Sequence, residues 1–309
     1  HYDREYGVDI DPDRVVVTPG TSPALWLSMA ALVDPGEEVV LTDPHYACYP
    51  NFVRTVEGRV RTVPLRASEG FQPRVTDFEA ALSADTRALL LNSPANPTGA
   101  VMDGETLAGL AAVARDHDAT PVVDEVYHGL SYDVAEHTML EYTDDAFVLN
   151  GFSKRFAMTG WRLGWVIVPP EYVDVVNRLA QNVLICAPNF VQDAGVAALS
   201  TPPERLAEIR ETYRERRDLL VEAVENWGLD LGYRPQGAYY LLADVSDLPG
   251  DALDVADLLL EEAGVAVTPG VDFGDEAADY LRFSYATDAD VIETAIDRID
   301  RVLATVERR

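Results

Sequence analysis

The sequence is nearly without lysine. Lys154 is the only lysine among 309 residues, and the other 23 basic residues are arginine. Arginine can bind carboxylates and supply positive charge, but its guanidinium does not lose a proton to act as a nucleophile. A lysine amine can do so, and it forms Schiff bases with carbonyl compounds. Two interpretations stay open: a lysine kept for its chemistry, or an arginine-biased composition with one remaining surface lysine.

Cysteine and long apolar runs are also scarce. Cys48 and Cys186 are the only cysteines, too few for a disulfide framework, and we expect both to be buried in a reducing compartment. No run of 18 apolar residues exists, so a membrane-spanning helix is not expected. The charged opening segment 1–14 does not have the pattern of a signal peptide. These features predict a cytoplasmic protein.

Positive charge is in short supply overall. The chain has 53 Asp and Glu against 24 Lys and Arg, a formal net charge of −29, and the acids are spread along its length. This charge disfavours nucleic acid and anionic membranes as partners, because both bind basic patches. Salt screens the self-repulsion of an acidic protein, so we expect an acidic surface and a halophilic source with a salt-rich cytoplasm.

The pattern of apolar runs predicts an α/β fold. Short Val- and Leu-rich runs alternate with helical patterns in the first half of the chain, which is typical of a mostly parallel sheet covered by helices on both faces. Helices are expected between most of these runs, including 22–33 and 104–117. The predicted strands are 14–18, 38–42, 59–63, 87–92, 120–127, 146–151 and 161–169.

The pattern changes after about residue 170. Long helices follow, and then a smaller alternation of strands and helices. We therefore expect a large domain over 10–200 and a small α+β domain over 201–309, with a bridging helix over 203–227. The strands predicted for the small domain are 238–245, 265–269 and 280–285, and its helices are 252–263 and 288–306.

Polar residues follow several predicted strands where each strand ends, which is where ligands bind in open α/β sheets. The segment TPGTSPAL is predicted to begin a helix, whose first turn has free N–H groups. Together with the hydroxyls of Thr21 and Ser22, these groups form an anion site suited to phosphate. NSPANPTG presents Asn96 on a rigid turn. Each also has a structural alternative, a plain helix cap in one case and an Asx-turn in the other.

Two further segments carry charged side chains. In VVDEVY, Asp124 ends an apolar strand and Tyr127 follows it. A carboxylate there is paired or neutralised, because an isolated buried charge is costly, and a structural ion pair would explain it too. In GFSKRFAMTGWRLGW, Lys154 follows a predicted strand and Arg162 lies eight residues further on.

The order of these segments resembles the class I/II aminotransferases of the pyridoxal phosphate fold-type I superfamily, and most closely the aspartate-aminotransferase-like subgroup. SKxFAMTGWRxG is specific to that family, and so is NSPxNPTG followed by VVDExY. The resemblance extends from about Val15 to Thr287. It implies an α/β fold with a smaller C-terminal domain, pyridoxal 5′-phosphate as cofactor, and ping-pong transfer of an amino group between an L-amino acid and a 2-oxo acid.

The resemblance also implies a role for each residue that matches the family's motifs. Lys154 would hold the cofactor as an internal aldimine and later move a proton, and Asp124 would keep the pyridinium nitrogen protonated. Asn96 and Tyr127 would hydrogen-bond the phenolic oxygen of the ring. The other implied cofactor residues are Thr21, Ser22 and Arg162 for the phosphate and Tyr46 for the ring face. No metal site is expected.

For the substrate, Arg282 in YLRFSYAT matches the family's arginine that binds the α-carboxylate, with Asn96 beside it. Without the resemblance, a surface arginine in an ion pair is an equal explanation. Gly151 departs from the family, where many relatives have a serine that helps to bind phosphate. The chain also begins later than its relatives, so no residue is assigned to the roles of their N-terminal segment. A homodimer is implied, with segment 182–189 near the partner.

Two other functions remain open. A carbon–sulfur β-lyase of the same fold would keep the same lysine, aspartate, tyrosine and arginine, and an aminotransferase-like regulator domain would keep the fold without the activity. Aspartate or a related amino acid is the leading substrate, although an acidic side chain needs a second cation that the sequence does not identify. Aromatic amino acids and alanine also stay open.

Overall fold

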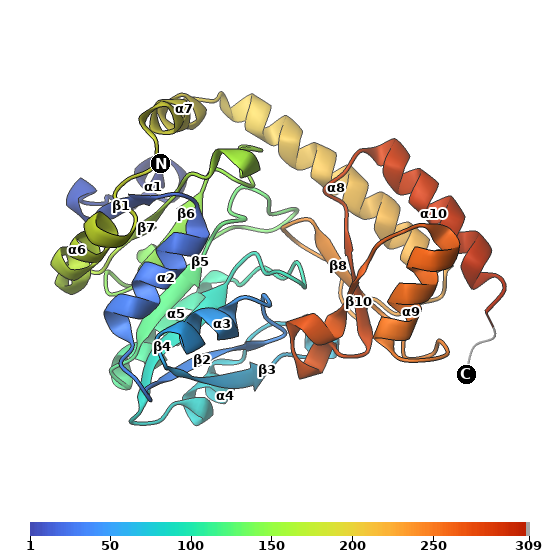
Figure 1. Cartoon of the computed structure of the whole chain (residues 1–309), viewed down its shortest axis with the longest axis horizontal. Coiled ribbons are helices and arrows are strands. Elements are labelled where there is room, and N and C mark those ends of the chain that lie inside the picture. The colour runs from blue at the N-terminus through green and yellow to red at the C-terminus, as the bar shows by residue number, and fades with distance from the viewer. Residues whose placement is uncertain (307–309) are drawn as a thin grey trace.

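The computed structural model describes residues 1–306, which contain a seven-stranded sheet and a three-stranded sheet side by side (Figure 1). The strand order of the larger sheet is β1-β7-β6-β5-β4-β2-β3. Neighbours from β3 to β6 pair in parallel, whereas β7 runs antiparallel between β6 and β1. The strands are β1 (Val15–Thr18), β2 (Glu38–Asp43), β3 (Arg59–Pro64), β4 (Thr86–Asn92), β5 (Thr120–Asp124), β6 (Phe147–Gly151) and β7 (Gly164–Ile167). The expected mostly parallel α/β sheet is confirmed.

The central strands are apolar because both faces of the sheet are covered. Leu89 and Leu91 of β4 pack into one core and Leu90 into another, and all three are almost fully buried. Helices α1 (Tyr2–Tyr6), α5 (Gly104–Asp116) and α7 (Asn189–Leu199) contribute to the first core, and α2 (Thr21–Leu32) and α6 (Val173–Val183) to the second. Two short helices, α3 (Tyr49–Thr55) and α4 (Val75–Ala81), pack beside β3.

The three-stranded sheet is antiparallel, with the order β8-β10-β9. A third core joins it to the C-terminal helices. Helix α8 extends from the larger sheet to the smaller one, as expected for 203–227 (Figure 1). The elements are α8 (Pro203–Asn226), β8 (Tyr240–Asp244), α9 (Ala252–Leu258), β9 (Thr268–Pro269), β10 (Tyr280–Ser284) and α10 (Ala289–Leu303).

Some of the predicted strands are too long. β5 ends at Asp124 because the Asp124 side chain accepts a hydrogen bond from the N–H of Val126, so the chain turns instead of continuing the ladder to residue 127. β7 begins only at Gly164, since Arg162 has a left-handed backbone conformation with φ 56°. β9 pairs with β10 through two residues only, so the prediction of a strand over 265–267 is wrong.

The expectation that both cysteines are buried is also wrong. Cys186 is exposed in the connection between α6 and α7, and Cys48 is half-buried. Both are free thiols. In the part of the chain that the structure describes, no helix is long and apolar enough to cross a membrane.

Candidate active site

A cavity of about 420 Å³ opens at the carboxyl ends of the strands of the larger sheet. At this cavity β4 ends with Asn92 and β5 ends with Asp124, and Lys154 follows shortly after the end of β6. Arg282 of β10 also reaches it, so the smaller sheet contributes to the same cavity. The cavity brings together all nine residues singled out in the sequence, which are Thr21, Ser22, Tyr46, Asn96, Asp124, Tyr127, Lys154, Arg162 and Arg282.

Asp124 is a buried carboxylate with few partners. The hydroxyl of Tyr49 donates to Oδ2 at 2.9 Å, and the N–H of Val126 donates to Oδ1 at 3.1 Å. Burial raises the pKa of Asp124, while the hydrogen bonds from Tyr49 and Val126 and the charge of Lys154 oppose that rise. A cation placed against this carboxylate would be strongly stabilised, because little water competes for it.

Lys154 lies in a tightly turned loop after β6. The Oγ1 of Thr159 donates to the backbone carbonyl of Ser153 at 2.8 Å, which closes the loop around the lysine. Ala157 has φ 53° and Arg162 has φ 56°, both in the left-handed region that costs energy for residues other than glycine. The Nζ of Lys154 lies 5.4 Å from the ring centroid of Tyr127.

The N-terminus of α2 provides an anion site. Its N-cap residue, Gly20, has no side chain to satisfy the N–H groups of the first turn, and Thr21 and Ser22 add hydroxyls at the cavity wall. Arg162 lies directly over this turn, since a Cβ at Gly20 would be 2.4 Å from its Nη2. Among the described residues 1–306, the Arg162 guanidinium donates only to two backbone carbonyls, those of Thr159 and Pro19, so its charge is available to an anion.

Gly151 lies in closely packed backbone. Gly151 pairs with Gly164 across β6 and β7, and a Cβ at Gly151 would lie 3.0 Å from the carbonyl oxygen of Leu163. A side chain there would require the neighbouring backbone to shift by a few tenths of an ångström. Ser153 and Thr159 line the cavity instead and offer hydroxyls on the same loop.

Arg282 is held flat between two aromatic rings. Its guanidinium carbon lies 4.3 Å from the ring centroid of Tyr240 and 4.6 Å from that of Phe273. Nη1 donates to Oδ1 of Asn96 at 2.9 Å, and Nη2 donates to Oγ1 of Thr268 at 3.1 Å. Within residues 1–306 no carboxylate pairs with Arg282, so the surface ion pair considered from the sequence is not present. Its planar fork is thus positioned to bind a carboxylate.

Sequence reasoning missed several residues of the cavity. Tyr49, which hydrogen-bonds Asp124, follows Tyr46 by three residues but carried no separate signal. Asn92 lies in the recognised NSPANPTG segment, and its amide donates to the carbonyl of Asp124 at 2.7 Å while its Oδ1 accepts from the N–H of Asn96. The other cavity residues not singled out are Leu25, Phe52, Val126, Ser153, Thr159 and Tyr240.

The residues of the cavity fit pyridoxal phosphate. The cofactor has an aldehyde that a lysine amine can capture, a ring nitrogen that needs an anionic partner when protonated, and a phosphate. Lys154, the buried carboxylate of Asp124 and the free first turn of α2 with Arg162 match these three groups.

Comparisons with known proteins agree with this fit. The family model for aminotransferase class I and II matches residues 1–299. The chain is 36% identical over 304 residues to a probable aspartate aminotransferase of Methanocaldococcus jannaschii, covering 96% of this chain and 80% of the relative. It is 38% identical over 312 residues to the aspartate/prephenate aminotransferase of Thermus thermophilus, covering 97% and 78%.

A solved structure gives the same result. The fold matches that of an aromatic aminotransferase from Pyrococcus horikoshii with a TM-score of 0.94 at 32% identity, covering 98% of this chain and 83% of that one. The family expected from the sequence motifs is confirmed, and so are the fold type, the pyridoxal phosphate cofactor and the assignment as an enzyme. The chain belongs to the aminotransferase class I and II family.

Proposed function

We propose that the cavity around Lys154 is the active site of this pyridoxal phosphate-dependent aminotransferase, with the residue roles implied by the resemblance. The supporting observation is that Lys154, Asp124 and the N-terminus of α2 surround a single cavity. Bound pyridoxal phosphate supplies an aldehyde that captures amines and a ring that takes up electrons from the substrate. Amino-group transfer between an amino acid and a 2-oxo acid follows from membership of the family.

In this proposal the residues of the larger sheet carry the chemistry. The Nζ of Lys154 bears the cofactor at rest and, once released, takes the proton from the substrate Cα. Asp124 holds the proton on the ring nitrogen, and Asn96 and Tyr127 donate to the phenolic oxygen. The first turn of α2 and Arg162 bind the phosphate, and Tyr46 covers the ring.

Arg282 binds the α-carboxylate of the substrate in the same proposal. Its clamp between Tyr240 and Phe273 fixes the plane of the guanidinium before the substrate arrives, which lowers the entropy cost of binding. Its bond to Asn96 links β10 to the turn after β4, so substrate binding would also hold the two sheets together.

Aspartate is the leading substrate, because four of the relatives are named for aspartate. Other relatives are named for valine and arginine, and the structural neighbour for aromatic amino acids, so the side chain has to be measured. A panel of amino-acid donors with 2-oxoglutarate, followed by absorbance at the cofactor, tests this choice. Rapid turnover of aspartate supports it, and turnover of aromatic donors alone contradicts it.

The same assay tests the reaction type. An aminotransferase needs a 2-oxo acid for continuous turnover, because that acid is the second substrate and accepts the amino group. Release of pyruvate and ammonia without any 2-oxo acid would indicate a carbon–sulfur β-lyase. No reaction with any donor, although the cofactor binds, would favour a regulator domain.

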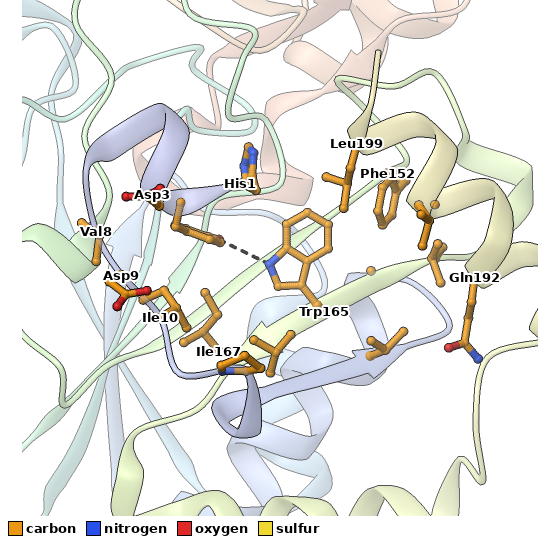
Figure 2. A pocket seen from close by; sticks show the side chains of 18 residues that line it. His1, Asp3, Val8, Asp9, Ile10, Phe152, Trp165, Ile167, Gln192 and Leu199 are labelled. Atoms are coloured by element: carbon orange, nitrogen blue, oxygen red, sulfur yellow. Dashed lines mark hydrogen bonds between the residues drawn. The ribbon is translucent and has the colours of Figure 1, made fainter. Parts of the chain in front are cut away.

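A homodimer is part of the proposal. Four apolar side chains near α7 are strongly exposed, Ile185, Phe190, Val196 and Val183 at 53–80%. Val196 also lines an apolar cavity of about 400 Å³, where Trp165 is bordered by α1 side chains and by Leu199 of α7 (Figure 2). Such a surface is costly in water, and a second copy would cover it.

Light scattering tests the dimer. Phe190→Asp should give monomers, whereas Leu253→Asp, at another exposed apolar side chain on α9, should leave the dimer intact. A monomeric wild-type protein contradicts the proposal. We also propose domain limits of 10–200 and 201–309, which limited proteolysis near residue 200 would test.

The acidic composition supports a halophilic source and a salt-rich cytoplasm. Salt should then raise the stability of the protein by screening repulsion among its carboxylates. Unfolding measured from low to molar salt tests this, and a steady loss of stability with added salt contradicts it. The cytoplasmic location stays a prediction from composition.

A further inference from the structure

The amine of Lys154 has a second aromatic neighbour that the proposed roles do not use. Nζ lies 5.4 Å from the ring centroid of Tyr239, the same distance as from that of Tyr127. The two rings meet edge to face, with centroids 5.3 Å apart and planes at 84°. Both side chains are buried. A cation within about 6 Å of a ring centroid is attracted to the face of the ring.

The two rings come from different parts of the molecule. Tyr127 follows β5 of the larger sheet, whereas Tyr239 directly precedes β8 of the smaller sheet. Tyr239 also stacks on Tyr213 of α8, with centroids 5.6 Å apart and planes at 30°. The lysine amine therefore lies near one ring from each part of the molecule, and the two rings adjoin each other on one side of it.

The backbone fixes Tyr239 firmly. Its carbonyl accepts a hydrogen bond from the N–H of Tyr285 at 3.0 Å, directly after β10. The carbonyl of the preceding Ala238 accepts a bond from the hydroxyl of Tyr132, which belongs to the loop that follows β5. The Tyr239 ring is thus placed by contacts to both parts of the molecule.

We propose that Tyr239 is a positioning residue that, together with Tyr127, holds the Lys154 amine against a pair of adjoining rings while the smaller sheet lies against the larger one. The inference rests on the proposed role of Lys154. A free lysine side chain has about 2 kcal/mol of rotamer entropy to lose, and attraction to the two adjoining rings restricts it before the reaction. A restricted lysine side chain keeps Nζ in place for each proton transfer. Replacing Tyr239 should therefore change kcat more than the KM for the amino acid.

The single lysine makes a direct test possible. In the full chain with ¹³C-labelled lysine, the Cε group of Lys154 gives the only lysine side-chain signal in an NMR spectrum, with or without added pyridoxal phosphate. The two rings should shift this signal away from the position of a solvated lysine. We expect Tyr239→Phe to keep the shift, because the ring remains, and Tyr239→Leu to lose much of it.

A matched control variant separates the effect of losing the ring next to Lys154 from the effect of a general loss of packing. Tyr233 is another tyrosine before β8, but it is only partly buried and packs against Phe71 rather than against Lys154. Tyr233→Leu should leave the Lys154 signal and the turnover unchanged. If Tyr239→Leu does not fold, Tyr239→Met supplies a side chain of similar length without a ring.

Turnover is the second measurement. Tyr239→Leu should lower kcat by about 10- to 100-fold with little change in KM, and Tyr239→Phe by less than about 3-fold. An unshifted Lys154 signal together with unchanged kcat in Tyr239→Leu would overturn the proposal. The NMR result does not depend on the substrate, so a wild-type protein that reacts with no donor would refute the proposed function while the lysine signal still tests Tyr239.

Discussion

The two sheets contribute to the cavity in different ways. The larger sheet provides groups at strand ends and at a helix N-terminus, and these include Lys154, Asp124 and the first turn of α2. The smaller sheet provides flat side chains, Arg282 and the tyrosines around it, that pack against those groups. This difference suggests a division of work: the larger sheet carries the chemistry, and the smaller sheet binds and positions.

The largest effect should come from Lys154 of the larger sheet. In our proposal Lys154→Ala removes the amine that would hold the cofactor and move the proton, so turnover should fall by at least about 10³-fold. Absorbance of the bound cofactor and steady-state rates check this. Substantial transamination by the variant would contradict the assignment of Lys154, and with it the role given to the larger sheet.

Asp124→Asn should have the next largest effect. The variant should still bind pyridoxal phosphate, but without a carboxylate beside the ring nitrogen its turnover should fall by about 10²- to 10³-fold. The rate of the half-reaction with an amino acid measures this directly. If that rate equalled that of the wild type, Asp124 would have no part in withdrawing electrons.

Arg282→Gln tests the smaller sheet. Loss of the fork that faces the substrate carboxylate should raise the KM for the amino acid by about 10- to 100-fold and change kcat less. Arg87→Gln, at a surface arginine paired with Glu37, serves as the control. A fall in kcat with constant KM would mean that the smaller sheet takes part in the chemical step.

Glu125 is a buried carboxylate outside the cavity, and replacing it should change turnover least and stability most. Glu125 follows Asp124 but accepts hydrogen bonds from Thr138 and the N–H of Met139. Burial raises its pKa from 4.5 to about 7. The folded protein therefore binds this proton more tightly than the unfolded chain, and the contribution of Glu125 to the unfolding free energy falls as the pH rises from 4.5 to about 7.

Glu125→Gln should remove that pH dependence. Urea unfolding near pH 5 should give similar stability for the variant and the wild type, and near pH 8 the variant should gain on the order of 3 kcal/mol relative to the wild type. Glu79→Gln, at an exposed position, is the control for loss of one charge. A constant difference between variant and wild type across this pH range would show that Glu125 does not titrate there.

The sequence predicted the larger sheet better than the smaller one, for a physical reason. Strands buried on both faces, such as β4, are continuous apolar runs, and the polar residues at their ends are therefore conspicuous. β9 has only two residues, and the apolar segment 265–267 before it forms no strand although its valines pack against the core. An apolar run alone does not distinguish these two outcomes.

Some contacts between distant segments could not be predicted from the sequence. Nothing in the sequence indicates that Tyr49 reaches Asp124, or that Tyr239 reaches Lys154, because each pair meets only through the arrangement of whole elements. The close packing around Gly151 is likewise not visible in the sequence, because it arises where β6 pairs with β7 at Gly164. The exposure of Cys186 also depends on where the connection after α6 lies.

The most direct test of the active site uses the only lysine in the chain. Borohydride reduction of the protein with bound pyridoxal phosphate, followed by peptide mass spectrometry, shows where the cofactor is attached. We predict one label, on Lys154. A label on the N-terminal amine alone, or no label on a protein that transfers amino groups, would contradict the account of this site.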